Sequence, residues 1–397
     1  MKILWINPNL LHPTTKGGQI RTLEMLRRLR RRHEIHYVAL QAPGNEEGLR
    51  RSAEYCSRVE LARHRVPHRY SPAFAGQLAA GLFSSLPVAI GRYRSPGLRR
   101  LLERLLASEG YASVVCDFLA ATPSMPSLAR AVLLQHNVET MIWRRHALHA
   151  TNPAARFYLR LQAERMFRYE RDVCRACRRV IAVSSVDAGQ MQSLFGIAEV
   201  PDIPTGVDVD YFTPPPRVEA VSDLVFLGSM DWLPNIDGVR HFCSEVLPLI
   251  RRRRARCSLT IAGRTPPAEI RVLAEKDPLV RVTGSVPDIR PCLWGSAVSI
   301  VPLRIGGGTR LKIYESMAAG VPVVSTSVGA EGLVFDDGAN ILIADEPEAF
   351  AEACLVLLED ASRWRALAAA AREMVVADFS WDRVADRLER ILIEAAG

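Results

Sequence analysis

The chain has 397 residues, of which 48% are hydrophobic and 24% are charged, and its formal net charge is +8. This composition excludes an intrinsically disordered chain, and the length is sufficient for two domains that each bury a core. The basic balance points to anionic partners, with nucleic acid and an anionic membrane as the main classes.

The first half of the chain alternates short apolar strands with amphipathic helices, which indicates an open parallel sheet covered by helices on both faces. The strands are predicted at residues 2–7, 35–40, 114–116, 132–134 and 180–183, and the main helices at 20–32 and 153–177.

Two places in this half are candidates for ligand contacts. Gly17 and Gly18 follow the first strand and precede a helix, so their backbone N–H groups would point toward a ligand at the strand ends. A tight turn without a ligand is the alternative. His136 directly follows the apolar run AVLLQ, where parallel sheets present functional residues. A histidine satisfied in the core or at the surface is its alternative.

Residues 201–216 contain five prolines and can form neither a helix nor a central strand, so we predict a hinge there. Beyond it the alternation restarts with the strands LVFLG, LTIAG, VRVTG, VSIVPL and VPVVST. These strands, separated by helices, predict a second doubly wound domain. A helix near 347–376 and a terminal helix to Ala395 follow.

Three residues at the strand ends of this second domain are expected to face a phosphate. Gly228 and Ser229 end its first strand, and Arg264 follows the second. Ligands of open α/β sheets bind at these carboxyl ends.

Residues 298–328 are the most informative segment, because they join a buried strand, a glycine turn, a basic pair and an acidic helix residue. The turn would let the backbone approach a ligand, and the helix after it would direct its positive end to the same place. Arg310 and Lys312 add charge, and Glu315 can accept hydrogen bonds from a sugar hydroxyl. This order favours a nucleotide diphosphate over a merely flexible loop. The turn consists of Gly306, Gly307, Gly308 and Thr309.

The block RLKIYESMAAGVPVVST, which starts at Arg310, resembles the donor-site segment of family-four glycosyltransferases, which are retaining enzymes of the GT-B fold. KILWINPN and the glycines after it resemble the first strand and loop of that family, and PTGVDVDYF resembles its interdomain linker. LVFLGSMDWLPNIDGV and QHNVET resemble a branch found among bacterial exopolysaccharide enzymes.

The resemblance implies two facing doubly wound, Rossmann-like parallel-sheet domains with the site in the cleft between them. Residues 1–200 would form the acceptor-side domain, completed by a crossing helix at 380–397, and residues 217–379 the domain that binds the nucleotide sugar.

The resemblance also implies roles for single residues. Gly17 and Gly18 would approach the donor diphosphate and the acceptor, and Val286 would lie at the nucleobase edge. His136 would hydrogen-bond the donor sugar or position the acceptor hydroxyl. The family usually carries two glutamates with seven residues between them, and here Glu315 fills the second place while Gly307 occupies the first. We therefore expect the sugar contacts to come from elsewhere, such as the amides of the glycine turn.

Arginine clusters at 27–32 and 92–100 flank the apolar residues 73–90. A basic and apolar surface suits docking on an anionic leaflet, where each nearby arginine contributes about 1 kcal/mol. A core or interdomain helix is the alternative for the apolar part.

Three patterns that suggest metals are set aside: the D-x-D at 208–210 lies in the hinge, the C-x-x-C at 174–177 has no second pair, and His146 and His149 lack an acidic partner. No apolar run is long enough to span a membrane, the first ten residues lack a signal-peptide pattern, and the eight cysteines lack framework spacing.

The sequence, together with this resemblance, thus predicts a cytoplasmic, metal-independent glycosyltransferase that uses a nucleotide-sugar donor such as a UDP- or GDP-sugar and needs no other cofactor. The resemblance implies that the enzyme is retaining. The predicted acceptor is a polysaccharide or a lipid-linked glycan, with peripheral contact to the inner face of the plasma membrane and no nucleic acid partner. One alternative is a sugar-nucleotide 2-epimerase of the same fold. Another is a non-catalytic basic protein that binds nucleic acid or lipid, which no aromatic-rich basic strand supports.

Overall fold

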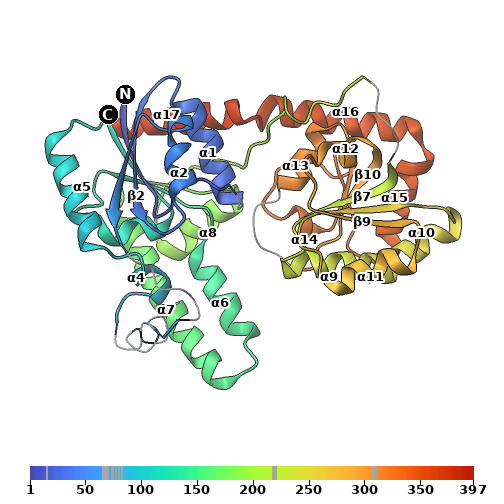
Figure 1. Cartoon of the computed structure of the whole chain (residues 1–397), viewed down its shortest axis with the longest axis horizontal. Helices are drawn as coiled ribbons and strands as arrows, with labels where there is room; N and C mark the ends of the chain where they lie inside the picture. Colours follow the sequence, from blue (N-terminus) through green and yellow to red (C-terminus); the bar gives the residue numbers. More distant parts are fainter. Residues whose placement is uncertain are drawn as a thin grey trace. The chain divides into compact units, whose positions relative to one another are not determined.

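The chain folds into two compact α/β units (Figure 1). Unit 1 holds residues 1–204 and 385–397, and unit 2 holds residues 205–384. Each unit is built on a six-stranded sheet whose neighbouring strands are all parallel. The computed structural model describes residues 1–14, 17–64, 71, 72, 76, 78, 81, 84–216, 221–305 and 311–397.

The sheet of unit 1 has the strand order β3-β2-β1-β4-β5-β6. The order reverses between β1 and β4, so the carboxyl ends of these two strands flank the point where open α/β sheets bind ligands. The strands are β1 (Lys2–Ile6), β2 (Glu34–Gln41), β3 (Arg58–Arg63), β4 (Ser113–Asp117), β5 (Ala131–Leu134) and β6 (Arg179–Ile181). The α-helices are α1 (Gly17–Leu29), α2 (Glu46–Arg50), α4 (Val88–Gly91), α5 (Pro96–Ser108), α6 (Glu139–His149), α7 (Pro153–Ala176) and α8 (Ser185–Phe195).

The sheet of unit 2 repeats this plan with the order β12-β11-β10-β7-β8-β9, and its reversal lies between β7 and β10. The strands are β7 (Ser222–Leu227), β8 (Leu259–Ala262), β9 (Val280–Gly284), β10 (Ser296–Val301), β11 (Val323–Ser325) and β12 (Leu342–Ile343). The helices are α9 (Leu233–His241), α10 (Leu247–Arg253), α11 (Ala268–Lys276), α12 (Arg290–Trp294), α13 (Leu311–Ala318), α14 (Ser327–Ala330), α15 (Pro347–Glu359) and α16 (Ala361–Asp378).

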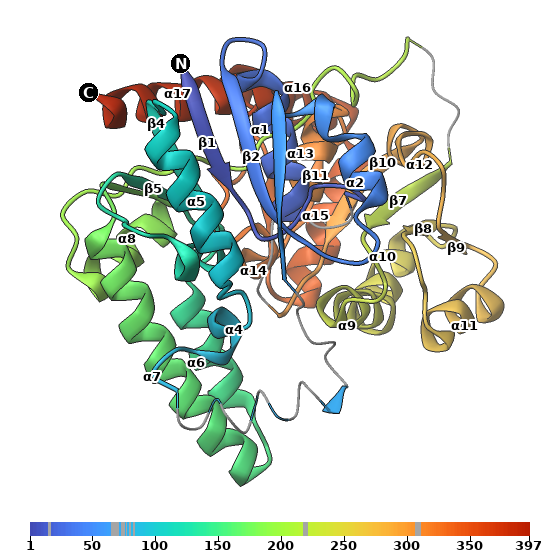
Figure 2. The same ribbon diagram turned by 60° about the vertical axis from the view of Figure 1, so that its left-hand side comes forward.

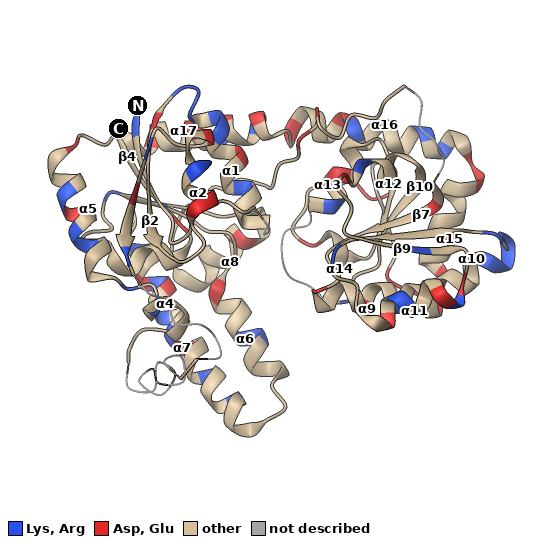
Figure 3. Cartoon of the chain, in the orientation of Figure 1, with Lys and Arg blue, Asp and Glu red and all other residues tan. Residues whose placement is uncertain are grey.

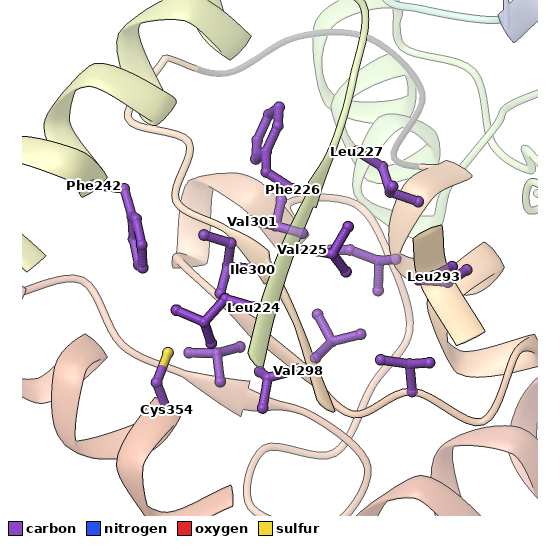
Figure 4. Close-up of a cluster of buried hydrophobic side chains, with 14 of the residues drawn as sticks. Leu224, Val225, Phe226, Leu227, Phe242, Leu293, Val298, Ile300, Val301 and Cys354 are labelled. Carbon is purple, nitrogen blue, oxygen red and sulfur yellow. The ribbon is translucent and has the colours of Figure 1, made fainter. Parts of the chain in front are cut away.

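Both faces of the unit 2 sheet are buried, as expected of a parallel sheet covered by helices. Phe226 and Val298 lie on adjacent central strands, and Phe242 and Cys354 reach the same core from the covering helices (Figure 4). All four side chains are inaccessible to solvent. This core fixes the ends of β7 and β10, which carry the candidate donor residues.

The last helix, α17 (Trp381–Ala396), begins in unit 2 and ends in unit 1. In unit 2, Val207 and Ser380 form a β-bridge, and a Cβ on Gly206 would lie 2.5 Å from the ring of Trp381. Residues 205–216 of the predicted hinge therefore group with unit 2. In unit 1, Arg387 donates to Asp202 at 2.9 Å.

The fold class predicted from the sequence is confirmed, with three differences in the elements. The edge strands β3 and β12 were not predicted. Helix α1 begins at Gly17 itself, before the predicted start. The helix predicted near 347–376 is two helices, because the Asp360 carboxylate accepts from Ser362 N and Arg363 N and caps a new helix.

Candidate active site

The carboxyl ends of β1 and β4 in unit 1 carry a buried polar cluster around Asp117. The Asp117 carboxylate has no solvent-accessible surface and accepts hydrogen bonds from four side chains. Trp5 Nε1, Asn7 Nδ2 and Thr22 Oγ1 donate to Oδ2 at 3.1, 2.8 and 2.8 Å, and His136 Nε2 donates to Oδ1 at 2.7 Å. Burial alone would raise the pKa of Asp117, but His136 and these donors lower it overall, so the carboxyl is ionised.

His136 is also buried, and its surroundings favour the neutral imidazole, whereas those of Asp117 favour the charged carboxylate. Burial lowers the pKa of its imidazole, and Asp117 offsets this only in part. Because Nε2 donates its hydrogen to Asp117, the neutral ring carries its lone pair on Nδ1. Nδ1 is buried and has no hydrogen-bond partner among the described residues. The side chain therefore presents one oriented acceptor, which can take a hydrogen bond from a hydroxyl group.

Phe118 and Gly18 fix where Nδ1 lies. The Phe118 ring stacks on the imidazole with a centroid separation of 3.9 Å and an interplanar angle of 9°. Phe118 has a φ of 72°, a backbone strain of about 1–3 kcal/mol for a residue with a side chain. A Cβ on Gly18 would lie 2.8 Å from Phe118 Cζ and 3.5 Å from His136 Nδ1. The first turn of α1 can thus approach the histidine only because residue 18 is glycine.

Arg21 of α1, like His136, is a buried group with unused hydrogen-bonding capacity. Its side chain is fully buried, and Nη2 donates to the carbonyl of Ile203 at 2.6 Å. Nε and Nη1 find no acceptor in the described part of the chain. Burial lowers the pKa of the guanidinium to about 10, opposed by the charge of Asp117. Arg21 in turn helps to keep His136 neutral.

Glu170 of α7 holds the segment that carries His136. Its carboxylate accepts from Gln135 Nε2 at 2.9 Å, from Glu139 N at 3.0 Å, and from Thr140 N and Oγ1 at 2.7 and 2.6 Å. It therefore caps the first turn of α6 from outside that helix. Burial raises the pKa of Glu170 to about 7, although the hydrogen bonds from Thr140 and Glu139 act against this rise.

In unit 2, the end of β7 carries an ammonium group held beside a glycine. Lys312 Nζ donates to Asn235 Oδ1 at 2.9 Å and lies 4.3 Å from the centroid of the Phe226 ring. Asn235 Nδ2 donates to the carbonyl of Ser229 at 2.8 Å. A Cβ on Gly228 would lie 2.8 Å from Lys312 Nζ and 2.7 Å from Asn235 Nδ2. The backbone of Gly228, which carries no side chain, and the ammonium group of Lys312 therefore lie next to each other where the strand order reverses.

Ser229 and Arg264 also meet, as their positions at neighbouring strand ends predict. Arg264 Nε donates to Ser229 Oγ at 2.7 Å, and Ser229 Oγ donates to Asp231 Oδ1 at 2.6 Å. Arg264 also lies 3.5 Å from Asp231, a partner that the sequence interpretation missed. Its guanidinium is therefore already paired with a carboxylate.

Glu315 follows Lys312 by one turn of α13, and its side chain is half-buried. Burial raises the pKa of Glu315 to about 7, and the charge of Lys312 opposes this rise only in part. The carboxylate thus titrates near neutral pH, where an ionised acceptor for hydroxyl groups can still form.

In the same unit, the ends of β8 and β9 border a pocket of about 540 Å³, a size suited to a small-molecule ligand. Val286, the residue predicted at the nucleobase edge, lies half-buried in the segment that follows β9. The pocket is lined by Thr265, Pro266, Arg271, Ala274, Val282, Thr283, Gly284 and Ser285.

Five predicted site residues lie outside the described residues: Gly306, Gly307, Gly308, Thr309 and Arg310. Among the residues that are described, no three His, Cys, Asp or Glu side chains are grouped so that they could hold a metal ion. Asp208 of the D-x-D pattern accepts from Tyr211 N at 2.9 Å and forms a turn.

The sequence interpretation missed Asp117, Phe118 and Arg21. One signal for Asp117 was present, because it directly follows the apolar run VVC as His136 follows AVLLQ. Two polar residues at the ends of consecutive strands lie near each other whenever the strands pair, as β4 and β5 do. No sequence pattern signals the unusual φ of Phe118.

Comparison with known proteins gives the family. Residues 15–211 match the family described as Glycosyltransferase Family 4, and residues 222–360 match that described as Glycosyl transferases group 1. The chain belongs to the family-four glycosyltransferases. The resemblance read from the block at Arg310 is thereby confirmed.

Relatives of this glycosyltransferase include a GDP-mannose-dependent alpha-(1-6)-phosphatidylinositol monomannoside mannosyltransferase from Mycobacterium tuberculosis. The two sequences are 30% identical over 234 residues, which are 54% of this chain and 61% of the relative. The match thus spans less than two thirds of the relative's length.

Solved structures share the GT-B fold. Sucrose-phosphate synthase from Thermosynechococcus elongatus has a TM-score of 0.69 at 16% identity, over 99% of this chain and 98% of that one. Anabaena HepE, solved with UDP and glucose, has a TM-score of 0.61 at 14% identity, over 99% and 100% of the two chains.

Proposed function

We propose that the chain transfers a hexosyl group from a nucleotide-diphosphate sugar to a hydroxyl of a polysaccharide or lipid-linked acceptor, with retention and without a metal ion, at the cytoplasmic side of the membrane. The main observation behind the proposal is that Asn235 holds the Lys312 ammonium group beside the backbone of Gly228. Family membership supports the reaction class.

The leaving group of such a reaction is a nucleoside diphosphate, on which negative charge develops. Lys312 supplies a preorganised positive charge, because Asn235 and the Phe226 ring hold its ammonium before a ligand arrives. Helix α13 starts at Leu311, and the N–H groups of its first turn add positive potential. In this proposal, these groups stabilise the departing diphosphate in place of a metal.

The nucleoside is assigned to the neighbouring end of the same sheet. Glu315 would accept hydrogen bonds from ribose hydroxyls, and the pocket at the ends of β8 and β9 would hold the base near Val286. Arg264 would meet a phosphate only by exchanging its contact with Asp231.

His136 is assigned to a hydroxyl of the donor sugar or of the acceptor. Its support is the free Nδ1 lone pair, oriented by Asp117 and by the stacked Phe118 ring. Gly17 and Gly18 open the approach to that atom from the first turn of α1.

Two donors are the first to test, because the mannosyltransferase relative is named for GDP-mannose and HepE was solved with UDP and glucose. The full chain is incubated with GDP-mannose or UDP-glucose and with a lipid-linked or polysaccharide acceptor, and nucleoside diphosphate release is measured with and without EDTA. We expect acceptor-dependent release that persists in EDTA, and product analysis that shows retention.

Lys312→Ala should reduce this release by about 10²-fold while the thermal unfolding midpoint stays within a few degrees. Lys276→Ala, at the end of α11, is the matched control and should keep full activity. Full activity of Lys312→Ala would remove the proposed donor site. Epimerised donor without acceptor dependence would favour the epimerase alternative, and salt-sensitive binding without turnover the non-catalytic one.

A further inference from the structure

A helical hairpin, α6 and α7, extends away from the sheet of unit 1 (Figures 1 and 2). The turn at its far end is well built, because Asn152 Oδ1 accepts from Ala154 N and Ala155 N at 2.9 and 3.1 Å and caps α7. Arg156 Nε donates to the carbonyl of Ala150 at 2.9 Å and ties α7 back to the end of α6. The tip is therefore an ordered surface.

This tip, defined as residues 140–163, carries the two most exposed large apolar side chains in the described part of the chain. Leu148 on α6 is 74% exposed and Phe157 on α7 is 69% exposed. Both lie within a few residues of the turn that joins the helices. Single exposed apolar residues are ordinary, but two at the end of one protrusion form a common apolar feature.

The tip is also purely basic. Residues 140–163 contain four arginines and two histidines and no aspartate or glutamate. Figure 3 shows arginines on both helices of the hairpin, and Arg156 and Arg160 are exposed. Exposed apolar side chains beside exposed arginines such as Arg156 and Arg160 are the pattern of a surface that binds anionic lipid.

Part of the basic surface predicted from the sequence, the cluster at 27–32, is neutralised by ion pairs within unit 1. Arg27 pairs with Glu24 and Glu54, and Arg28 pairs with Glu24. Arg32 pairs with Asp386 and Glu389 of α17. Arg27, Arg28 and Arg32 are thus engaged in the fold, which favours the hairpin tip over the 27–32 cluster as a membrane contact.

We propose that the tip of the α6–α7 hairpin docks on an anionic lipid bilayer, with Leu148 and Phe157 entering the headgroup region and Arg156 and Arg160 contacting lipid phosphates. A second copy of this chain is a poorer partner, because pairing two tips would bring eight arginines together without a carboxylate. The proposal is independent of the donor site, since it concerns a separate surface of unit 1.

The test uses the full chain without donor and measures flotation with vesicles of phosphatidylcholine alone or mixed with phosphatidylglycerol. We expect binding only to the mixed vesicles, weakened by added salt because exposed charges are screened. Leu148→Ser with Phe157→Ser should weaken binding about tenfold, and Arg156→Ala with Arg160→Ala by a similar factor. The emission of Phe157→Trp should gain a blue-shifted component on vesicle binding.

The matched controls are Val186→Ser with Ile393→Ser, whose side chains are 52% and 53% exposed elsewhere in unit 1, and Arg50→Ala with Arg178→Ala, which lie outside the tip and both predicted arginine clusters. Both controls should bind as the unaltered chain does. The proposal fails if the tip variants bind normally, if the controls lose binding equally, or if the tip binds RNA in preference to vesicles. It also fails if the tip variants change only the oligomeric state seen by light scattering. Nucleotide release with a soluble acceptor should stay unchanged in the tip variants, which separates this test from that of the proposed function.

Discussion

At the scale of single residues, the buried pair of Asp117 and His136 determines which charge and which hydrogen-bonding atom unit 1 presents to a ligand. The carboxyl stays ionised and the imidazole stays neutral, so the pair holds one negative charge and one free acceptor atom. A carboxylate that fixes a histidine tautomer is a common way to orient a group for hydrogen bonding or proton transfer. The strained Phe118 backbone also helps to orient His136, because it places the ring on which the imidazole stacks.

Gly18→Ala tests whether this packing positions His136, and the substitution alters no polar side chain. The added methyl would lie 2.8 Å from Phe118 Cζ, so the ring and the stacked imidazole must shift. We expect transfer to fall by up to about 10²-fold, as displacements near 1 Å can cause, with little change in the free energy of unfolding. Gly189→Ala in α8 is the control, because its new methyl meets no atom within 4 Å. It should stabilise the chain by about 0.5–1 kcal/mol and keep full activity. Equal behaviour of the two variants would contradict the packing argument.

Glu315 makes donor binding depend on pH. Because burial raises its pKa to about 7, the carboxyl is mostly protonated at pH 6 and mostly ionised at pH 8. If ribose hydroxyls donate to the ionised form, the affinity for an intact sugar nucleotide should fall about tenfold between pH 8 and pH 6. Titration calorimetry at several pH values measures this. Glu315→Gln should bind more weakly at pH 8 and lose most of the dependence; an unchanged slope would mean that another group titrates.

At the scale of elements, helix α6 depends on a carboxylate from α7. Glu170 takes the place of an N-cap side chain, since Val138 at the N-cap position makes no side-chain cap hydrogen bond. The same carboxylate binds Gln135, next to His136. One buried group thus links the hairpin that we propose as a lipid contact to the loop that carries the histidine.

Glu170→Gln should change how stability varies with pH. The folded pKa of about 7 lies above the ordinary value of 4.5, so between these values the unfolded chain holds fewer protons than the folded chain. The stabilisation from this group is complete below about pH 4.5 and is lost as the pH rises through 7, with a slope of at most about 1.4 kcal/mol per pH unit. In the variant, the free energy of unfolding, measured with urea, should no longer contain this contribution to its change with pH. The substitution should also cost about 0.5–2 kcal/mol as a lost helix cap.

Glu164→Gln on the same helix is the control for that experiment. Glu164 pairs with Arg168 at 2.9 Å on an exposed face, so its loss should change the free energy of unfolding by less than about 1 kcal/mol and leave the pH slope intact. A pH slope in Glu170→Gln equal to that of the unaltered chain would show that Glu170 is ionised throughout.

The elements also show what sequence reasoning could reach. Buried strands such as β4, β5 and β7 contain the apolar runs VVC, AVLL and LVFL, and their positions were predicted closely. Strand β3 was missed because Arg58–Arg63 is an edge strand in which Arg58 and Glu60 pair with each other and with charged neighbours, so its composition is that of a surface loop. Lys312 and Gly228 were both predicted as donor residues, but no role was predicted for Asn235, which holds the lysine. The Asp117 cluster joins residues from four segments, and no local pattern could assemble it.

At the scale of the whole molecule, the two units repeat one strand order and place their polar groups at the same point of it. In unit 1 the reversal between β1 and β4 carries Asn7 and Asp117, and in unit 2 the reversal between β7 and β10 carries Gly228 beside Lys312. One fold plan therefore gives two different polar clusters, one with a buried hydrogen-bond acceptor atom on His136 and one with the ammonium group of Lys312.

The difference between the two polar clusters predicts which unit binds a nucleotide. Hydrogen exchange of the full chain with and without UDP or GDP should show the greatest added protection in unit 2, at residues 228–235, 263–265 and 311–316, because these segments carry the cationic group and the first turn of α13. The β1 and β4 ends of unit 1 should change less, since their charged member is a carboxylate that repels phosphate. Lys312→Ala should abolish the protection and Lys276→Ala should retain it. Protection centred on Asp117 and His136 instead would assign the nucleotide to unit 1 and overturn the proposed roles of the two sheets.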